Sequence, residues 1–203
     1  MIGKIFVTSS GYDPDKGKDV KDPYLGETAS LGACRPDIRR TLHIGDQIFV
    51  VSGKLKDYSQ YIIGGFEISE KITALEAYER FPEQRLKLDE CGTVTGNIII
   101  DSTGHQHELD HHASDTFDRR IENYVVGTNP IVLATEVEVD EGRKRTLEIL
   151  REVFAKKGDS IRDLIGRCRN MTEKQVHKLR DCLEDIKNPT ASVQQHSFAD
   201  RRN

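Results

Sequence analysis

A short cationic segment stands out because its residue types could bind an anion. It runs from Leu31 to Arg40 and contains Arg35, Arg39 and Arg40. A Gly-Asp pair then indicates a tight turn, and the apolar run 47–52 predicts a core strand. The arginines would thus be delivered to the edge of a small sheet, where guanidinium groups can contact phosphates. The alternative is a surface turn with solvated arginines.

Cys34 stands beside Arg35 and is therefore a candidate nucleophile. A guanidinium next to a thiol lowers the pKa of the thiol and favours the thiolate. Catalysis would also need a base or acid within reach. The candidates for that role are His111, His112 and Asp115. The alternative is a packed thiol, which the spacing from Leu31 and Ile38 along one helical face favours.

Four histidines stand close together in the middle of the chain, with acidic residues between them. They are His105, His107, His111 and His112. Imidazole and carboxylate groups at this spacing could bind a divalent metal. Neither HExxH nor a paired CxxC accompanies them, so a solvated polar loop is the commoner interpretation. We therefore expect no metal and no other cofactor.

Polar and aromatic residues near the ends of predicted strands could read a base. Ser10 and Tyr12 lie in the turn after the first predicted strand, and Ser52, Gly53 and Lys54 follow a central one. An aromatic side chain can stack on any base, because every base has a π-face. Glycine allows the backbone to approach a ligand closely, and a lysine there could meet a phosphate.

The composition fits one domain or one domain with an appendage. The chain has 203 residues, of which 36% are hydrophobic and 32% charged. The four cysteines are widely spaced, which suits reduced thiols in a cytoplasmic protein better than a disulfide framework. We expect no membrane contact, because the sequence holds no run of about eighteen apolar residues and no secretory signal.

The net charge of −4 conceals an asymmetry along the chain. Residues 143–187 hold thirteen Lys/Arg and eight Asp/Glu, a balance of +5. Residues 1–142 hold fifteen and twenty-five, a balance of −10, and the last sixteen residues add +1. The basic segment could attract a polyanion, or it could pack against the acidic body of its own chain.

Short strands with small helices between them predict an α+β fold, in the form of a small, partly closed mixed β-barrel with flanking helices. The expected strands span residues 4–9, 47–52, 61–68, 97–101, 124–128 and 131–139, of which the last two are either separate strands or one broken strand. The expected helices start near residue 36, at 143, and at capping patterns at Thr73, Ser160 and Thr172. The helix from 160 is expected to reach Cys168, and the one from 172 to carry an apolar stripe of Val176, Leu179, Leu183 and Ile186. We expect a barrel domain over residues 1–140, a helical segment packed on it over 141–188, and a flexible tail over 189–203. The sequence contains neither GxGxxG nor a P-loop.

Several of these residues together resemble the nucleotide modification associated domain family, type 2. The matching elements are Gly11-Tyr12-Asp13-Pro14, the stretch Leu31–Arg39, Gly45-Asp46, and the His111–Phe117 element. The loop after Pro14 is longer and more charged than in that family, and Gln47 stands where an aromatic residue often follows Gly-Asp. The strand–Gly-Asp–strand unit is also similar to the PUA-like superfamily, which includes EVE, ASCH and YTH domains. That second resemblance implies a small barrel that binds RNA or a flipped modified base.

Three functional hypotheses follow. In the first, the chain recognises a modified base, with Ser10, Tyr12 and Ser52 around the base. The groups expected to hold the nucleic-acid backbone are Arg35, Arg39, Arg40 and Lys54, of which Arg35, Arg39 and Lys54 are expected to line one concave site at the mouth of the barrel. In the second, it is an enzyme that acts on a modified nucleotide through the cysteine and histidines named above. In the third, it is a protein-interaction subunit of a DNA-modification or phage-defence system, docking through its C-terminal helices.

Overall fold

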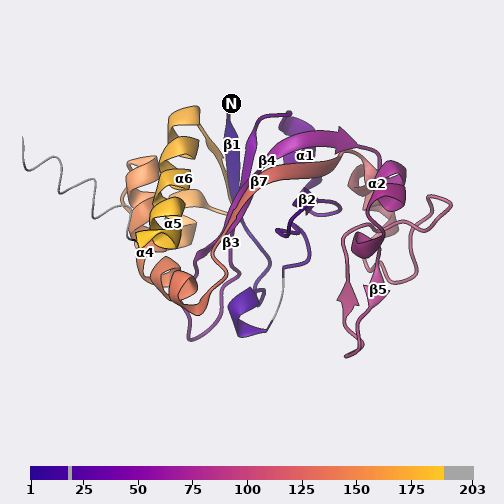
Figure 1. The fold of residues 1–203 in the computed structure, drawn as a ribbon, viewed down its shortest axis with the longest axis horizontal. Helices are drawn as coiled ribbons and strands as arrows, with labels where there is room; N and C mark the ends of the chain where they lie inside the picture. Colours follow the sequence, from indigo (N-terminus) through magenta and orange to yellow (C-terminus); the bar gives the residue numbers. More distant parts are fainter. Residues whose placement is uncertain (18–19, 190–203) are drawn as a thin grey trace, which may run out of the picture. The chain divides into compact units, whose positions relative to one another are not determined.

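The computed structural model describes residues 1–17 and 20–189, and it has the expected α+β class. Within these residues six strands form one mixed sheet in the order β2-β7-β4-β3-β1-β8 (Figure 1). The strands are β1 (Gly3–Val7), β2 (Ser30–Leu31), β3 (Gln47–Val51), β4 (Ile62–Ile72), β7 (Tyr124–Val132) and β8 (Cys168–Met171). At the two edges β8 pairs antiparallel with β1, and β2 pairs antiparallel with β7. A separate hairpin joins β5 (Lys87–Leu88) to β6 (Val94–Thr95).

Helices connect the strands and follow them. The α-helices are α1 (Pro36–Thr41), α2 (Ala74–Arg80), α3 (Phe117–Ile121), α4 (Glu136–Phe154), α5 (Ile161–Ile165) and α6 (Glu173–Lys187). Three short 3-10 helices are η1 (Pro14–Lys16), η2 (Pro82–Gln84) and η3 (Ser114–Thr116). The helix expected from Pro36 is confirmed, and so is the one capped by Thr73, which forms a capping box with Glu76.

Contacts group the chain into two compact units, each built from separate segments. We call the first the helical unit; it comprises Met1–Lys18, Phe49–Gly65 and the chain from Ile131 onward. We call the second the loop-rich unit; it comprises Asp19–Ile48 and Phe66–Pro130. The predicted domains were consecutive stretches of the chain. The two units of the structure instead alternate along the sequence. The predicted tail, except for residue 189, lies outside the described residues.

The helical unit is stabilised by apolar stripes on its long helices. Helix α4 packs against α5 and α6, as Figure 1 shows in orange and yellow. The stripe predicted on α6 is buried, as expected for an amphipathic helix. Its members are Val176, Leu179, Leu183 and Ile186. The predicted capping boxes at Ser160 and Thr172 are both formed, so these sequence signals placed the two helix starts correctly.

The helix expected to start at residue 143 starts earlier, at Glu136, because Thr135 caps it. Three further sequence predictions in this fold are also wrong. The strand expected over 131–139 ends at Val132, because Thr135 caps helix α4. The alternating Glu-Val-Glu-Val sequence forms the first turn of that helix. Val137 is 77% exposed there. The helix expected over 160–168 ends at Ile165, since Gly166 takes a left-handed φ of 63° and β8 follows. The strand expected over 97–101 is a buried loop with isolated bridges at Ile98 and Ile100.

A buried polar network organises the loop-rich unit. The hydroxyl of Tyr124 lies 2.7 Å from Oε1 of Gln84 and 2.9 Å from Oδ1 of Asn97. Asn97 Nδ2 donates to the Ser30 hydroxyl, which in turn donates to Gln84 Oε1. All four side chains are buried, and their mutual bonds offset the cost of removing polar groups from water. This network connects β2, β7 and the loop at 97.

None of the helices in the described part of the chain combines the length and the apolar character that crossing a bilayer requires.

The cap of α4 gives the first prediction. The Thr135 hydroxyl accepts the amide of Glu138, whose carboxylate accepts the amides of Ala134 and Thr135. Replacing Thr135 by Ala should lower the free energy of unfolding by about 1 kcal/mol, because the helix loses a cap acceptor. The Thr135→Ser variant keeps a hydroxyl and should unfold close to wild type in urea. An alanine variant with an unchanged urea midpoint would contradict this role.

Candidate functional site

The turn after β1 presents the Tyr12 side chain on the helical unit, with 38% of the residue exposed. Hydrogen bonds of both its amide and its carbonyl fix the backbone of Tyr12. The Tyr12 amide donates to the carbonyl of Ser9 at 3.1 Å, and the Gly53 amide donates to the carbonyl of Tyr12 at 2.7 Å. Gly11 takes a φ of 87°, which glycine adopts at little cost. An exposed aromatic ring is therefore carried by an immobilised backbone.

Gly53 makes this arrangement possible because no side chain fits at its position. A Cβ there would lie 2.0 Å from the Ser9 carbonyl oxygen and 2.9 Å from the Tyr12 nitrogen. The next residue, Lys54, offers its carbonyl to the Gly11 amide and to the Ser10 hydroxyl, each at 3.2 Å. The structure thus brings together four of the predicted ligand residues, Ser10, Tyr12, Gly53 and Lys54. The Lys54 side chain is exposed, and its ammonium has no bonding partner among the described residues.

Ser52 does not share this surface. It is fully buried, and its hydroxyl accepts the amide of Tyr61 at 3.1 Å. Its own amide donates to the carbonyl of Tyr61, and its carbonyl accepts the side chain of Gln60. The structure differs from the sequence prediction here: Ser52 holds the segment between β3 and β4 together and cannot contact a surface ligand.

A buried ion cluster lies directly behind the Tyr12 turn. Asp13, almost fully buried, accepts two hydrogen bonds from Arg143 of α4, at 2.9 and 3.0 Å. Arg143 also binds Asp15 at 2.9 Å and the carbonyl of Ser59 at 2.5 Å. Hydrogen bonds from Arg143 and Lys16 lower the pKa of Asp15. Sequence reasoning missed this cluster, because Asp13 and Arg143 are 130 positions apart and neither carries a motif that points to the other.

The arginine segment occupies the loop-rich unit, and Arg39 is at its centre. Arg39 is fully buried, and each of its five N–H groups has a carbonyl acceptor. The acceptors are Ala33, Cys34, Arg120, Glu122 and Asn123. No donor is left for a phosphate. Arg39 is thus a structural residue here, which differs from the prediction that it holds a nucleic-acid backbone.

The same segment encloses the Asp22 carboxylate. The successive amides of Gly32, Ala33 and Cys34 all donate to it, the first two at 2.7 and 2.8 Å. Such a run of amides forms a concave anion site, and here the chain fills that site itself. Burial raises the pKa of Asp22, while the three amides and the charge of Arg39 oppose the rise. A Cβ on Gly32 would lie 2.5 Å from the Asn97 carbonyl oxygen, so glycine is required there.

The surroundings of Cys34 do not favour a nucleophile. Burial, followed by the charge of Asp22, raises the pKa of the thiol, which is opposite to the shift expected from an adjacent arginine. The Arg35 guanidinium instead binds Asp37 at 2.6 Å, while Arg40 is exposed. The ionisable groups that affect this thiol are Asp22, Arg120 and Arg39. The predicted partners His111 and Asp115 are exposed, and His112 binds Asp110.

The histidine loop is held by contacts within itself. Nδ1 of His112 lies 2.6 Å from the buried Asp110 carboxylate, and Nδ1 of His107 accepts the Leu109 amide. Nδ1 of His105 lies 2.7 Å from the Thr103 hydroxyl. Within the described ranges, no three His, Cys, Asp or Glu side chains converge as a metal site would require. His111 and Asp115 are exposed.

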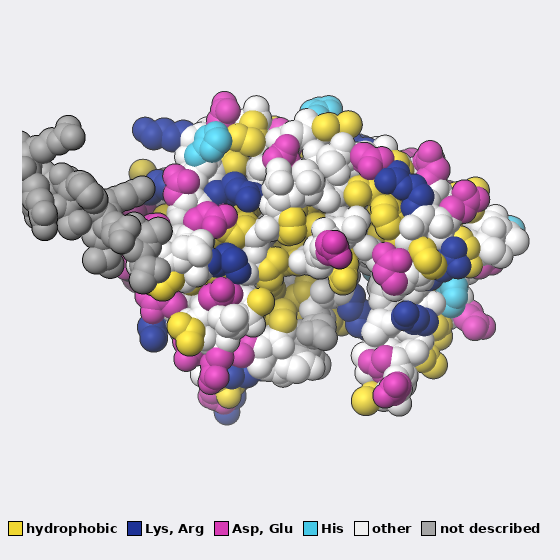
Figure 2. Space-filling model, in the orientation of Figure 1, with side chains coloured by type: hydrophobic (Ala, Val, Ile, Leu, Met, Phe, Trp, Pro, Cys, Tyr) yellow, Lys and Arg dark blue, Asp and Glu magenta, His cyan; other side chains and the backbone are white. Residues whose placement is uncertain are grey.

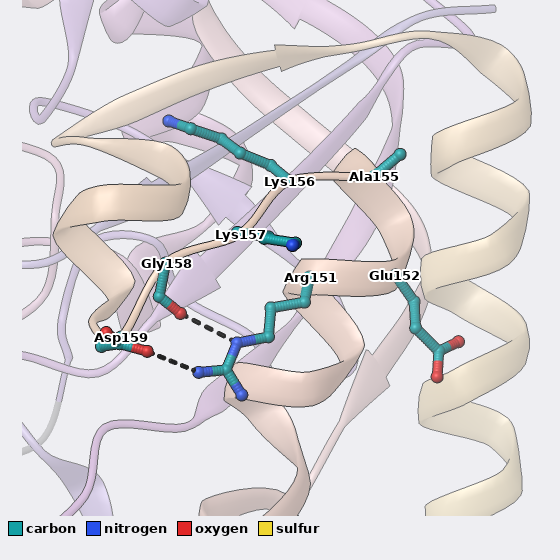
Figure 3. Close-up of a pocket in the computed structure, with 7 residues that line it drawn as sticks. All are labelled: Arg151, Glu152, Ala155, Lys156, Lys157, Gly158 and Asp159. Carbon is teal, nitrogen blue, oxygen red and sulfur yellow. Dashed lines mark hydrogen bonds and ion pairs between the residues drawn. The ribbon is translucent and has the colours of Figure 1, made fainter.

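An open hollow of about 570 Å³ lies at the C-terminal end of α4. Its basic lining does not make it an anion site. Figure 3 shows the Arg151 guanidinium turned toward Gly158 and Asp159, which it binds at 2.8 and 3.1 Å. The terminal carbonyls of a helix also carry partial negative charge. Two other hollows, of about 690 and 530 Å³, are lined by residues outside the predicted ligand set.

The basic segment 143–187 is partly balanced by neighbouring acids. Five of its thirteen Lys/Arg side chains form ion pairs with carboxylates of the same unit. They are Arg143, Lys144, Arg151, Lys178 and Lys187. Figure 2 shows acidic and basic side chains interspersed over the visible face of this unit. Of the two interpretations left open by the sequence, these pairs favour packing against the chain's own acidic residues.

Comparison with known proteins adds no relative: no family model matches the chain, and neither a curated protein nor a solved structure resembles it significantly. The resemblance to the nucleotide modification associated domain therefore stays a prediction.

The buried guanidinium gives the second prediction. Replacing Arg39 by Met should lower the free energy of unfolding by about 3–5 kcal/mol, because five carbonyl groups lose their donor in a buried site. Arg39→Lys keeps the charge but loses the planar guanidinium with its five N–H donors, so its free energy of unfolding should lie between those of wild type and Arg39→Met. The neighbouring Arg40→Met variant changes an exposed side chain, so its free energy of unfolding should stay within about 0.5 kcal/mol of the wild-type value. Equal urea midpoints for the Arg39 and Arg40 variants would be incompatible with the structural role.

The Cys34 thiol gives the third prediction. Iodoacetamide should modify exposed Cys91 readily at pH 8 and Cys34 very slowly, as followed by peptide mass spectrometry. The native thiol holds its proton more tightly than the unfolded one. Stability should therefore fall as the pH rises above about 8.5, since the native state then binds more protons. A Cys34 that is alkylated as fast as Cys91 would restore the nucleophile hypothesis.

Proposed function

We propose that this chain is a nucleic-acid-associated module that recognises a modified base or nucleotide, and that the base stacks on Tyr12. The observation that carries the proposal is the combination of an exposed ring with a backbone fixed by Ser9 and Gly53. A tyrosine that only packs in the core would be buried. A surface tyrosine without a role would not require its backbone to be fixed by a close contact with a glycine.

The groups around Tyr12 suit the edges and the phosphate of a nucleotide. The Ser10 hydroxyl donates a hydrogen bond to the Lys54 carbonyl. Its oxygen can therefore accept a hydrogen bond from an amino group on the base. Lys54 follows β3, its carbonyl is bonded to this turn, and its exposed side chain can meet a phosphate. Stacking of one base on an aromatic residue contributes about 1–3 kcal/mol, enough to make Tyr12 the main anchor.

Among the predicted arginines of the loop-rich unit, Arg40 is the exposed one. Its exposed side chain can contact a phosphate, whereas Arg35 is engaged with Asp37 and Arg39 with backbone carbonyls. We further propose that the mixed sheet is a partly closed PUA-like barrel, in a cytoplasmic protein of a DNA-modification or phage-defence system. The α+β class and the helices beside the sheet support the barrel, and the sequence resemblance supports the context.

The fourth prediction tests the anchor. Fluorescence anisotropy would be recorded with oligonucleotides that carry N6-methyladenine, 5-methylcytosine or unmodified bases. Tyr12→Ala should weaken binding roughly 5- to 150-fold, which corresponds to 1–3 kcal/mol, while Tyr12→Phe should bind like wild type. Lys54→Ala should reduce the salt slope by about one phosphate contact.

Controls separate loss of contact from loss of structure. Each variant would be compared with wild type by circular dichroism and thermal unfolding, because exposed side chains should affect neither. The proposal is wrong if wild-type protein binds none of the oligonucleotides at low salt. It also fails if Tyr12→Ala binds as tightly as the parent.

A further inference from the structure

We infer that the ligand of this surface is a single-stranded segment, and that Tyr58, in the same unit, is a second stacking residue in addition to Tyr12. This inference rests on the proposed function. Tyr58 is 47% exposed and lies in the surface segment 53–60, which also exposes Lys54 and Lys56. Aromatic side chains alternating with lysines are the arrangement by which proteins hold unpaired nucleotides.

One guanidinium connects the two tyrosines. Asp13, the residue after Tyr12, binds Arg143, and the central carbon of that guanidinium lies 5.6 Å from the centre of the Tyr58 ring. Arg143 also holds the carbonyl of Ser59, the residue after Tyr58. The Arg143 side chain is only 10% exposed, so it is a positioning residue and not a ligand contact. The turn at Tyr12 and the segment at Tyr58 are thus fixed against the same buried charge.

Lys16 covers the Tyr58 ring in the structure, and a base can replace it. Its ammonium lies 4.6 Å from the ring centre and pairs with Asp15 at 3.0 Å. Both partners reach the surface, and ion pairs of this kind contribute little to stability. A stacked base would displace the ammonium from the ring, and the ammonium could then contact the phosphate attached to that base.

Two separate stacking residues distinguish a single strand from a duplex. A base flipped out of a duplex presents one nucleobase to the protein, because its neighbours remain stacked in the helix. A single strand can offer successive bases to Tyr12 and Tyr58, with phosphates near Lys54, Lys56 and Lys16. The charged groups around the two tyrosines nearly balance. Lys16, Lys54, Lys56 and Arg143 stand against Asp13, Asp15 and Asp57, which leaves a local charge of +1.

The fifth prediction compares three probes: a single-stranded oligonucleotide of about twelve residues, its duplex, and a nucleoside monophosphate. Wild type should bind the single strand more tightly than the duplex. Tyr58→Ala should weaken the single strand roughly 5- to 150-fold and leave the monophosphate unchanged, whereas Tyr12→Ala should weaken both. Tyr58→Phe is the matched control and should behave like wild type. Lys56→Ala should lower the salt slope for the single strand by about one.

The outcomes separate this inference from the proposal beneath it. Equal binding of duplex and single strand, or a Tyr58→Ala variant with wild-type affinity, overturns the single-strand inference while an effect of Tyr12→Ala keeps the proposed function. Absence of binding to all three probes overturns both. Thermal unfolding of the Tyr58 variants verifies that an exposed side chain was changed without loss of the fold.

Discussion

The loop-rich unit depends on the burial of one arginine. The Arg39 guanidinium satisfies five backbone carbonyls that belong to two stretches, 33–34 and 120–123, far apart in the sequence. Burial lowers the pKa of Arg39, and the nearby Asp22 carboxylate opposes that shift. A buried charge is tolerated only when its hydrogen-bonding capacity is met. The irregular backbone around Arg39 is therefore constrained to one arrangement, because each carbonyl must remain in reach of the fork.

Asp22 is the counterpart of Arg39. The amides of the stretch 32–34 donate to the Asp22 carboxylate. Two carbonyls of the same stretch accept hydrogen bonds from Arg39. The network of Tyr124, Gln84 and Asn97 continues this polar core toward β2 and β7. Polar groups here replace the regular sheet bonds that short strands such as β2 cannot supply.

The helical unit uses an arginine for a different purpose. Arg143 joins α4 to the turn at 13–15 and to the segment before β4, and it leaves Tyr12 and Tyr58 exposed. Its side chain lies 4.7 Å from the centre of the Tyr61 ring, which supplies a cation–π contact on the buried side. Rigid support beneath exposed aromatic residues lowers the entropy lost when a ligand binds.

The sequence by itself determined the elements with strong local signals. Capping boxes at Thr73, Ser160 and Thr172 placed three helix starts, and apolar runs placed β3 and β4, because caps and periodicity act between neighbouring residues. Only the tertiary structure decided what each arginine does. Arg39 and Arg40 are adjacent and chemically identical, yet one is enclosed by carbonyls and the other faces solvent. The pairing of Asp13 with Arg143 likewise spans 130 positions. Burial and long-range charge pairing depend on which segments fold together, and no local pattern carries that information.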